Sequence, residues 1–124
     1  MADPRHTLGH DGERIAEKSL RAKGLRVLAR RYVTPTGELD LVMRDRQTVV
    51  FVEVKTRHGN ALADPQDAVN RGKQRRLLKA AEWFLHDRKL EDQPCRFDVV
   101  SIVIPGDDQD PVVEHFEDAF LPNQ

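Results

Sequence analysis

The 124-residue chain is predicted to form a single α/β domain with a mixed sheet. Two observations predict this fold class. Segments with a helical spacing of apolar residues alternate with β-branched segments, in the order α-β-β-β-α-β. The length suits one domain, taken as residues 1–124, and it allows a core that needs no metal or disulfide to fold.

The first helix is expected to begin between Thr7 and Asp11 and to run to Lys23. Leu20 lies on its apolar stripe, and Gly24 then supplies a stop signal. Three strands should follow, because the next segments are rich in β-branched residues and separated by turn residues. They are expected at residues 25–32, 38–44 and 48–56, with a turn at 34–37.

The second half of the chain is predicted to begin with a loop at 58–63 and a long helix. Asp64 is expected to be its N-cap and Pro65 its first residue, and the helix should continue to about Arg88. Leu77 and Phe84 lie on its apolar stripe. The remaining segments are expected to be a strand at 97–104, a polar loop at 105–111, a short edge strand within 112–116 and a turn at 117–120.

Charge is divided unevenly along the chain. Residues 1–90 hold 19 Lys/Arg and 12 Asp/Glu, whereas residues 91–124 hold 1 and 9, so a +7 body and a −8 end give the net −1. A basic body indicates an anionic partner, although charged residues that simply cover the surface would give the same count. Residues 105–124 are interpreted as an acidic C-terminal extension. One hypothesis is that this extension shields the basic body from binding non-specific DNA.

Several classes of protein are not expected. No apolar run approaches the ~18 residues of a membrane span, and the N-terminus lacks the apolar stretch of a secretory signal. Cys95 is the one cysteine, so no internal disulfide can form, and a cytoplasmic location is expected. No Cys/His cluster has the spacing of a zinc site.

Charged side chains occupy positions in the second and third strands where apolar residues would be expected. Strand alternation puts Asp40 on one face of its strand, and Glu53 and Lys55 on one face of the next. A four-residue loop between the strands would place Asp40 directly opposite Glu53, whereas a two-residue loop at 45–46 would place them diagonally. The opposite faces are expected to point to the core and carry Leu39, Leu41, Met43, Val50, Val52 and Val54.

Two carboxylates that face each other across a hairpin repel, and a divalent cation would remove this repulsion. Hard cations such as Mg²⁺ prefer carboxylate, carbonyl and water oxygens. Lys55 points to the same side as Glu53, where it is expected to stay protonated and to stabilise charge on a phosphate. The competing interpretation is a solvated ladder of ion pairs in which Lys55 bridges Glu53 and Asp40.

The hairpin motif carries a resemblance to a known family. Gly-Glu-Leu-Asp-Leu-Val at 37–42, followed by Val-Phe-Val-Glu-Val-Lys-Thr-Arg at 50–57, closely resembles the bacterial YraN-like family. That family is similar to archaeal Holliday-junction resolvases and to the wider PD-(D/E)xK nuclease superfamily. The resemblance covers nearly the whole chain, including Gly12-Glu13, residues 73–77 and 96–100. It implies a restriction-endonuclease-like fold and a Mg²⁺- or Mn²⁺-dependent endonuclease that hydrolyses phosphodiester bonds in DNA, with branched DNA as one candidate.

The resemblance also implies roles for individual residues. Asp40 and Glu53 would be metal ligands, with the backbone carbonyl of Val54 as a further ligand, and Lys55 would be the catalytic lysine. Glu13 matches the acid of the first helix that completes such sites. Without the resemblance, Glu13 would be interpreted as an ordinary acid near a helix N-terminus.

Basic residues gather on the long helix beside this motif. Lys73 lies on the stripe that faces the sheet, where it could contact a phosphate or extend along the surface to solvent. The residues expected to track a phosphate backbone are Arg57, Arg71, Lys73, Arg75, Arg76 and Lys79. Similar resolvases act as dimers, so a homodimer is implied as well. The alternative functions are a nucleic-acid-binding module without turnover and a protein-interaction domain that uses the acidic end.

Overall fold

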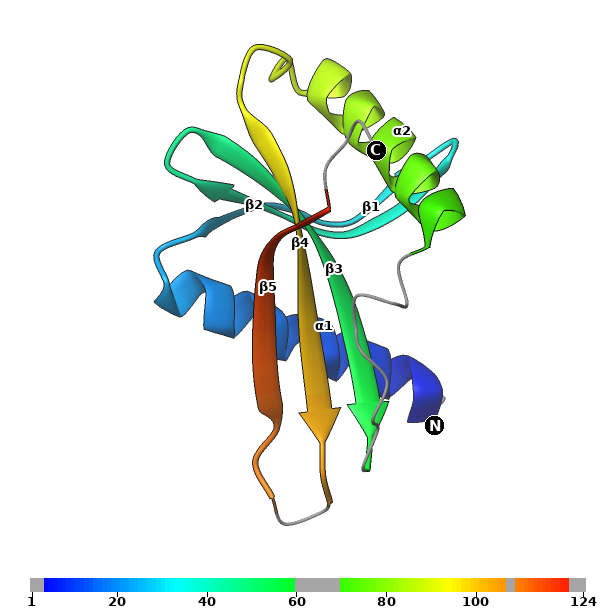
Figure 1. The fold of residues 1–124 in the computed structure, drawn as a ribbon, viewed down its shortest axis with the longest axis vertical. Coiled ribbons are helices and arrows are strands. Elements are labelled where there is room, and N and C mark those ends of the chain that lie inside the picture. The colour runs from blue at the N-terminus through cyan, green and yellow to red at the C-terminus, as the bar shows by residue number, and fades with distance from the viewer. Residues whose placement is uncertain (1–3, 60–69, 107–108, 121–124) are drawn as a thin grey trace.

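The computed structural model describes residues 4–59, 70–106 and 109–120, with side chains from residue 11 onward. Its elements are α1 (Pro4–Ala22), β1 (Arg26–Thr34), β2 (Gly37–Asp45), β3 (Thr48–His58), α2 (Arg71–Asp87), β4 (Cys95–Ile104) and β5 (Val112–Phe120). The strands form one sheet in the order β1-β2-β3-β4-β5 (Figure 1). β3 and β4 are parallel and the other neighbours antiparallel, so the predicted mixed α/β sheet is confirmed, and it is compatible with a nuclease-like fold.

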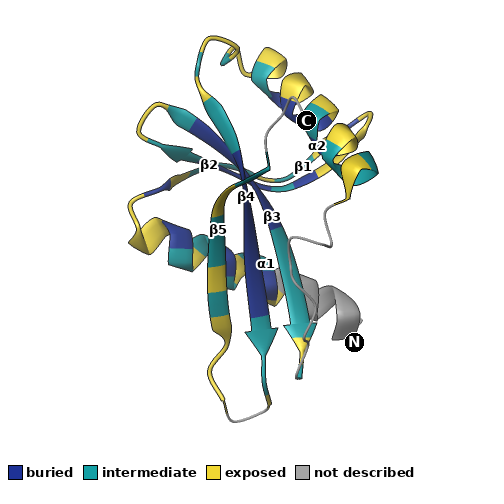
Figure 2. Ribbon diagram, in the orientation of Figure 1, coloured by how far each residue is buried: buried dark blue, intermediate teal, exposed yellow. Residues whose placement is uncertain are grey.

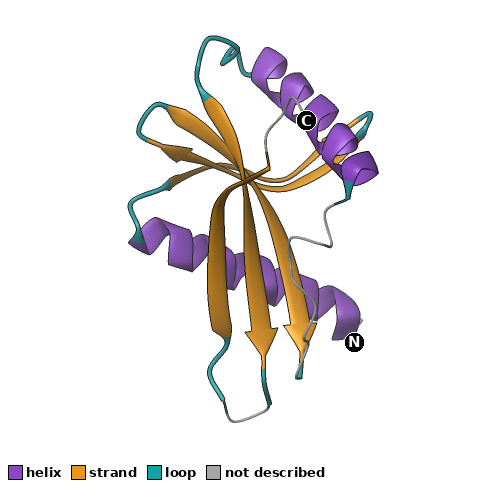
Figure 3. Ribbon diagram, viewed as in Figure 1, coloured by secondary structure: helices purple, strands orange, loops and turns teal. Residues whose placement is uncertain are grey.

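The two helices cover opposite faces of the sheet (Figure 3). Leu20 of α1 packs in a cluster with Leu41 and other residues of the α1 face, whereas Phe84 of α2 packs with Phe51 on the opposite face. β4 crosses the middle of the molecule and is the most continuously buried strand (Figure 2). Both faces of the sheet therefore carry a hydrophobic core, and the charged residues of the β2–β3 hairpin lie at the edges of these two cores.

Leu39 differs from the prediction that it shares a core face with Leu41. It packs in the cluster beneath α2, whereas Leu41 packs in the cluster beneath α1. Strand alternation therefore breaks at Asp40, which lies between them. Arg31 lies across from this point on β1, between the residues paired with Leu39 and Leu41, and it has a left-handed φ of 48°. Asp40 accordingly lines hollows on both faces of the sheet, one with Leu77 of α2 and one with Glu13 of α1.

The helix boundaries differ in part from the predictions. α1 begins at Pro4, earlier than expected, and ends as predicted before Gly24, whose φ is 99°. α2 begins at Arg71 rather than at Pro65; Asp64 and Pro65 lie outside the described residues. The observed N-cap is Asn70, whose side chain accepts a hydrogen bond from the Lys73 N–H at 2.9 Å. No helix in the described part of the chain is long and apolar enough to cross a membrane.

β5 is a full edge strand, so the turn predicted at 117–120 is wrong. The β4–β5 ladder is irregular between Phe97 and Val99, which pair with Phe120 and Phe116. Asp118 has a φ of 55° in this bulge, and its N–H donates to Asp98 Oδ1 at 2.9 Å. The polar Glu-Asp pair therefore marks a bulge within the strand.

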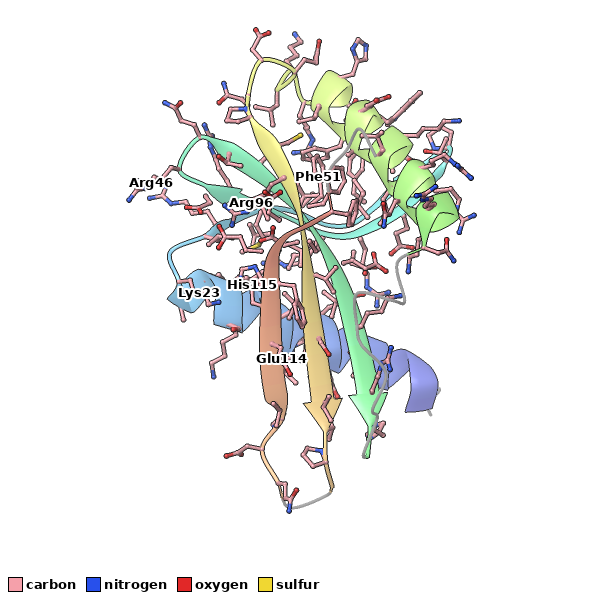
Figure 4. All side chains as sticks on the ribbon, viewed as in Figure 1. Lys23, Arg46, Phe51, Arg96, Glu114 and His115 are labelled. Atoms are coloured by element: carbon pink, nitrogen blue, oxygen red, sulfur yellow. The ribbon has the colours of Figure 1, made fainter. Side chains whose placement is uncertain are left out.

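Asp98 is fully buried and joins β5 to the rest of the sheet. It accepts from Arg96 at 3.1 Å and contacts His115 Nε2 at 2.7 Å. Arg96 also pairs with Asp45 and Glu117, each at 3.1 Å, and Lys23 Nζ lies 2.9 Å from His115 Nδ1, as Figure 4 shows for the labelled residues. Part of the acidic end is thus built into the fold, and Asp98 has a structural role.

Candidate functional site

The β2–β3 hairpin brings the two predicted carboxylates together. Arg44 pairs with Val49, and the ladder ends at the pair Leu41–Val52. Asp40 and Glu53 come one residue later, beyond the last paired residues, so the register is the predicted direct one and the diagonal one is wrong. The turn is shorter than the four-residue loop that was tied to this register, because Asp45 and Thr48 still pair.

Asp40 lies where β2 and β3 separate. Its Oδ2 accepts a hydrogen bond from the Val54 N–H at 3.0 Å. This side chain therefore supplies an acceptor to a backbone donor of β3 just beyond the last paired residues. The same contact fixes the carboxylate beside the residue whose backbone carbonyl is the candidate third ligand.

The pKa of Asp40 is raised from 3.8 to about 7. Burial is the largest cause, because it disfavours the charged form, and the neighbouring carboxylate of Glu53 adds repulsion. The Val54 N–H opposes the shift, and Glu13 contributes further repulsion. The predicted conflict between facing carboxylates is thus present in the structure, with Glu13 close enough to take part.

Glu53 is buried, with 7% of its surface exposed, and it meets two lysines. Its Oε1 lies 3.2 Å from Lys55 Nζ and 2.5 Å from Lys73 Nζ. Lys55 comes from the same strand, whereas Lys73 reaches down from the first turn of α2, which Asn70 caps. The site therefore holds two carboxylates, Asp40 and Glu53, and two lysines, Lys55 and Lys73, which come from β2, β3 and α2.

The two lysines differ in their electrostatic surroundings. The pKa of Lys55 is lowered, first by burial and then by the nearby Lys73, against the attraction of Glu53. Burial also opposes charge on Lys73, but hydrogen bonding to Glu53 and Lys55 raises its pKa overall. The sequence argument counted only carboxylates around Lys55 and included neither its burial nor the nearby Lys73.

Glu13 lies beside this group but is held by another partner. Arg31 Nε of β1 contacts its Oε2 at 2.7 Å. Glu13 and Asp40 also line one hollow of about 370 Å³ between α1 and the sheet. Gly12 lets the helix approach this closely, since a Cβ at this position would collide with the Thr56 side chain on β3. The structure therefore brings Glu13 to the site as an ion-paired residue.

The remaining predicted basic residues have different surroundings. Lys73 turns toward Glu53, and Arg57 is half-buried and takes part in interactions of its own. The other predicted residues of α2 are exposed, namely Arg71, Arg75, Arg76 and Lys79. Arg76 lines a hollow together with Lys73 and Glu38. The exposed basic residues of α2 thus form a surface that adjoins the carboxylate site through Lys73.

Two features of this site were not predicted from the sequence. One is the direct Lys73–Glu53 ion pair, and the other is the Arg31–Glu13 pair. A signal for the first exists, because Asn70 is a favoured N-cap residue and would place Lys73 in the first turn of the helix. The second depends on the left-handed conformation of Arg31, for which the sequence carries no signal.

The fold and this hairpin site define a mixed α/β protein whose architecture is compatible with nucleases, with two carboxylates and two lysines at the separation of β2 and β3. Comparison with known proteins then places the chain in a family. The model of the uncharacterised protein family UPF0102 matches residues 12–102, and the chain belongs to this family. The YraN-like resemblance is thereby confirmed.

Individual relatives agree over nearly their whole lengths. The chain is 46% identical to a UPF0102 protein of Syntrophotalea carbinolica over 97% of this chain and 96% of the relative. It is 45% identical to one of Geotalea daltonii over 92% and 89% of the two chains. It is 38% identical to one of Pelotomaculum thermopropionicum over 97% of this chain and 100% of the relative.

Proposed function

We propose that this protein is a metal-dependent nuclease that hydrolyses phosphodiester bonds in DNA, with branched DNA as a candidate substrate. One observation carries the proposal: Asp40 and Glu53 meet in a largely buried site that also holds Lys55 and Lys73. Such a set can bind a cation and present ammonium groups to a phosphate. The family resemblance and the nuclease-compatible architecture support the same conclusion.

The residues present fit Mg²⁺ or Mn²⁺. No three Asp, Glu, His or Cys side chains converge on one point in the described part of the chain. Mg²⁺ does not need such a cage, because it commonly uses one or two carboxylates together with water and substrate oxygens. The pKa of Asp40 is raised first by burial and then by repulsion from Glu53, and a cation between the two carboxylates would offset that repulsion. Asp40, Glu53 and the Val54 carbonyl would hold the ion.

The bound cation would polarise the phosphate and lower the pKa of a water molecule. The lysines then have separate roles. Lys55, held at 3.2 Å from Glu53, would stabilise negative charge on the phosphate. Lys73, which pairs with Glu53 Oε1, would contact a phosphate oxygen when a substrate is bound. The exposed basic face of α2 would hold the adjoining backbone.

Cleavage of labelled DNA tests the proposal. Four-way junction, single-stranded and duplex substrates are incubated with Mg²⁺ or Mn²⁺ and with wild-type protein, Asp40→Asn or Glu53→Gln. Glu38→Gln is the matched control, since it removes an exposed acid from the same strand as Asp40. We expect cleavage by the wild type and by Glu38→Gln, with a loss of at least ~100-fold in the other two variants. Absence of cleavage by the wild type, or unchanged cleavage by Asp40→Asn, would refute the proposal.

One observation favours a second candidate, a nucleic-acid-binding module without turnover. Glu13 and Glu53 each already have a cationic partner, Arg31 and Lys73, so their charges are offset without a metal. This function predicts salt-dependent DNA binding that persists in Glu53→Gln, together with no heat of Mg²⁺ binding in calorimetry. Metal binding that depends on Asp40 would exclude it in favour of the nuclease.

A further inference from the structure

A second basic surface lies at the opposite end of the β1–β2 ladder from Asp40. We propose that Arg26, Arg44 and Arg46, here called the arginine cluster, bind the phosphate backbone of duplex DNA. The choice of DNA as the anion rests on the proposed function, whereas the anion site itself rests on the geometry of these three residues. None of them belongs to the carboxylate site or to the basic face of α2.

The cluster contains an unfavourable pair of charges. Arg26 and Arg44 are direct partners in the antiparallel β1–β2 ladder. Like charges that lie directly opposite in such a ladder destabilise it. In the described part of the chain, no Asp or Glu forms an ion pair with Arg26, Arg44 or Arg46. An anion from outside the chain would offset this repulsion.

Nearby acids are engaged elsewhere. Asp45, next to Arg44 in sequence, gives its carboxylate to Arg96 at 3.1 Å. Glu17 of α1 is taken by Arg30 at 2.6 Å. Most other cations of the sheet have acidic partners, as at Arg31 and Arg96. The arginine cluster is therefore an excess of positive charge within an otherwise balanced network of ion pairs.

The local shape also suits an extended anion. Arg26, Arg44 and Arg46 line one hollow of about 520 Å³, which an adjoining hollow lined by Arg21 and Arg26 extends along β1. Arg44 Nε donates to the Arg46 carbonyl at 2.9 Å, which fixes that guanidinium and leaves its terminal nitrogens available. Arg46 stands at the tip of the β2–β3 hairpin and points outward from the molecule (Figure 4).

The spacing allows one nucleic acid to reach both sites. Arg44 follows Asp40 by four residues on β2, which corresponds to ~13 Å along a strand. A duplex advances that distance in about four base-pair steps, with a phosphate on each strand at every step. The arginine cluster would thus hold an arm of the DNA several nucleotides away from the phosphate at Asp40, and would add affinity without taking part in the chemistry.

Binding of a fluorescent 30-base-pair duplex tests the inference, measured by anisotropy in EDTA at several salt concentrations so that cleavage does not interfere. We expect Arg26→Gln/Arg44→Gln/Arg46→Gln to bind at least ~10-fold more weakly at 0.1 M salt. The slope of log K against log salt is negative, and its magnitude should decrease by about 2–3, close to one unit for each lost phosphate contact. An unchanged slope in the triple variant would overturn the proposal.

The chain offers a closely matched control. Arg46 and Lys89 are both exposed basic residues at left-handed turn positions, with φ values of 57° and 56°. Arg46→Gln should weaken binding and lower the slope by about 1, whereas Lys89→Gln should leave both unchanged. Equal effects of the two substitutions would mean that net charge alone acts, and would refute a defined site. Equal competition by a poly-glutamate peptide and by unlabelled duplex would refute the assignment to DNA.

Stability provides an independent readout. Since Arg44 repels Arg26 in the free protein, Arg44→Gln should leave the melting temperature equal or higher while it weakens DNA binding. A lower melting temperature would indicate a structural role instead. If the wild type cleaves no substrate but the triple variant still loses binding, the proposed function fails and the arginine cluster stands. If cleavage depends on Asp40 and DNA binding does not depend on the arginine cluster, the proposed function stands and the arginine cluster fails.

Discussion

Replacing Asp40 with asparagine should make the free protein more stable at neutral pH. The carboxylate is largely buried against Glu53, and its pKa is raised to about 7 from 3.8 in the unfolded chain. Asparagine has the same shape and keeps an oxygen acceptor for the Val54 N–H, which donates at 3.0 Å. It removes the charge, and so it removes the cost of burying that charge beside a second carboxylate.

The magnitude depends on pH in a defined way. The folded state holds the Asp40 proton more tightly than the unfolded state does, so the stability associated with this group is present below pH 4 and is lost as pH rises toward 7. At about 1.4 kcal/mol per pKa unit, the loss at pH 8 is at most ~4 kcal/mol. Asp40→Asn should therefore gain less than ~1 kcal/mol at pH 4, ~3 kcal/mol at pH 6 and up to ~4 kcal/mol at pH 8.

Chemical denaturation at these pH values, followed by circular dichroism, measures the gain. Glu38→Gln is the control, because it neutralises an exposed acid on the same strand and should change stability by less than ~0.5 kcal/mol at every pH. Addition of Mg²⁺ should stabilise the wild type and leave Asp40→Asn unaffected. A gain that does not vary with pH, or a loss of stability at pH 8, would refute the electrostatic argument.

Three further substitutions test other contacts by their effect on the free energy of unfolding. Lys73→Met should cost about 2 kcal/mol, because it leaves the buried Glu53 with one cationic partner in place of two. Asp98→Asn should cost ~3–5 kcal/mol, since it removes the fully buried charge that pairs with Arg96 and His115. Gly12→Ala should cost ~1–3 kcal/mol, because the new methyl group would collide with Thr56 on β3. Denaturant titration measures all three.

Each of these substitutions has a control that changes the same chemistry at a less constrained position. Lys79→Met and Glu117→Gln alter exposed residues and should stay within ~0.5 kcal/mol of the wild type. Gly72→Ala places its methyl group 3.4 Å from Asn70 Oδ1, which requires little movement, and it gains helix propensity. Equal losses in a variant and its control would contradict the contact assigned to the variant.

The hairpin could be predicted from the sequence because its determinants are local. Alternating side chains and a short polar connection predict that Asp40 lies either opposite Glu53 or diagonal to it, and both registers bring the two carboxylates together. The neighbours of these residues are different in kind. Lys73 reaches Glu53 from the first turn of α2, which begins at Arg71 after the Asn70 cap and not at Pro65 as predicted. The pair joins α2 to β3, and alternation along a strand does not predict a contact between two separate elements.

The errors elsewhere have a similar physical origin. Glu117 and Asp118 were interpreted as a turn because polar residues are common in turns, but the fold uses them in a bulge opposite Asp98. The expectation of one apolar and one charged face failed because α2 buries the face that carries Phe51. A strand pattern reports alternation, and it does not report how many helices will cover the sheet.

The position of β5 after β4 in the sequence has a consequence for synthesis in the cell. Asp98 is made 20 residues before Asp118, the last of its hydrogen-bond partners. Until β5 arrives, Asp98 lacks His115, and the ring of Phe97 lacks Phe120, whose centroid lies 4.8 Å away in the folded protein. The described sheet can therefore be completed only after β5 has been translated. A chain that terminates before β5 would leave that edge of β4 uncovered, and we expect it to be degraded faster than a chain that includes β5.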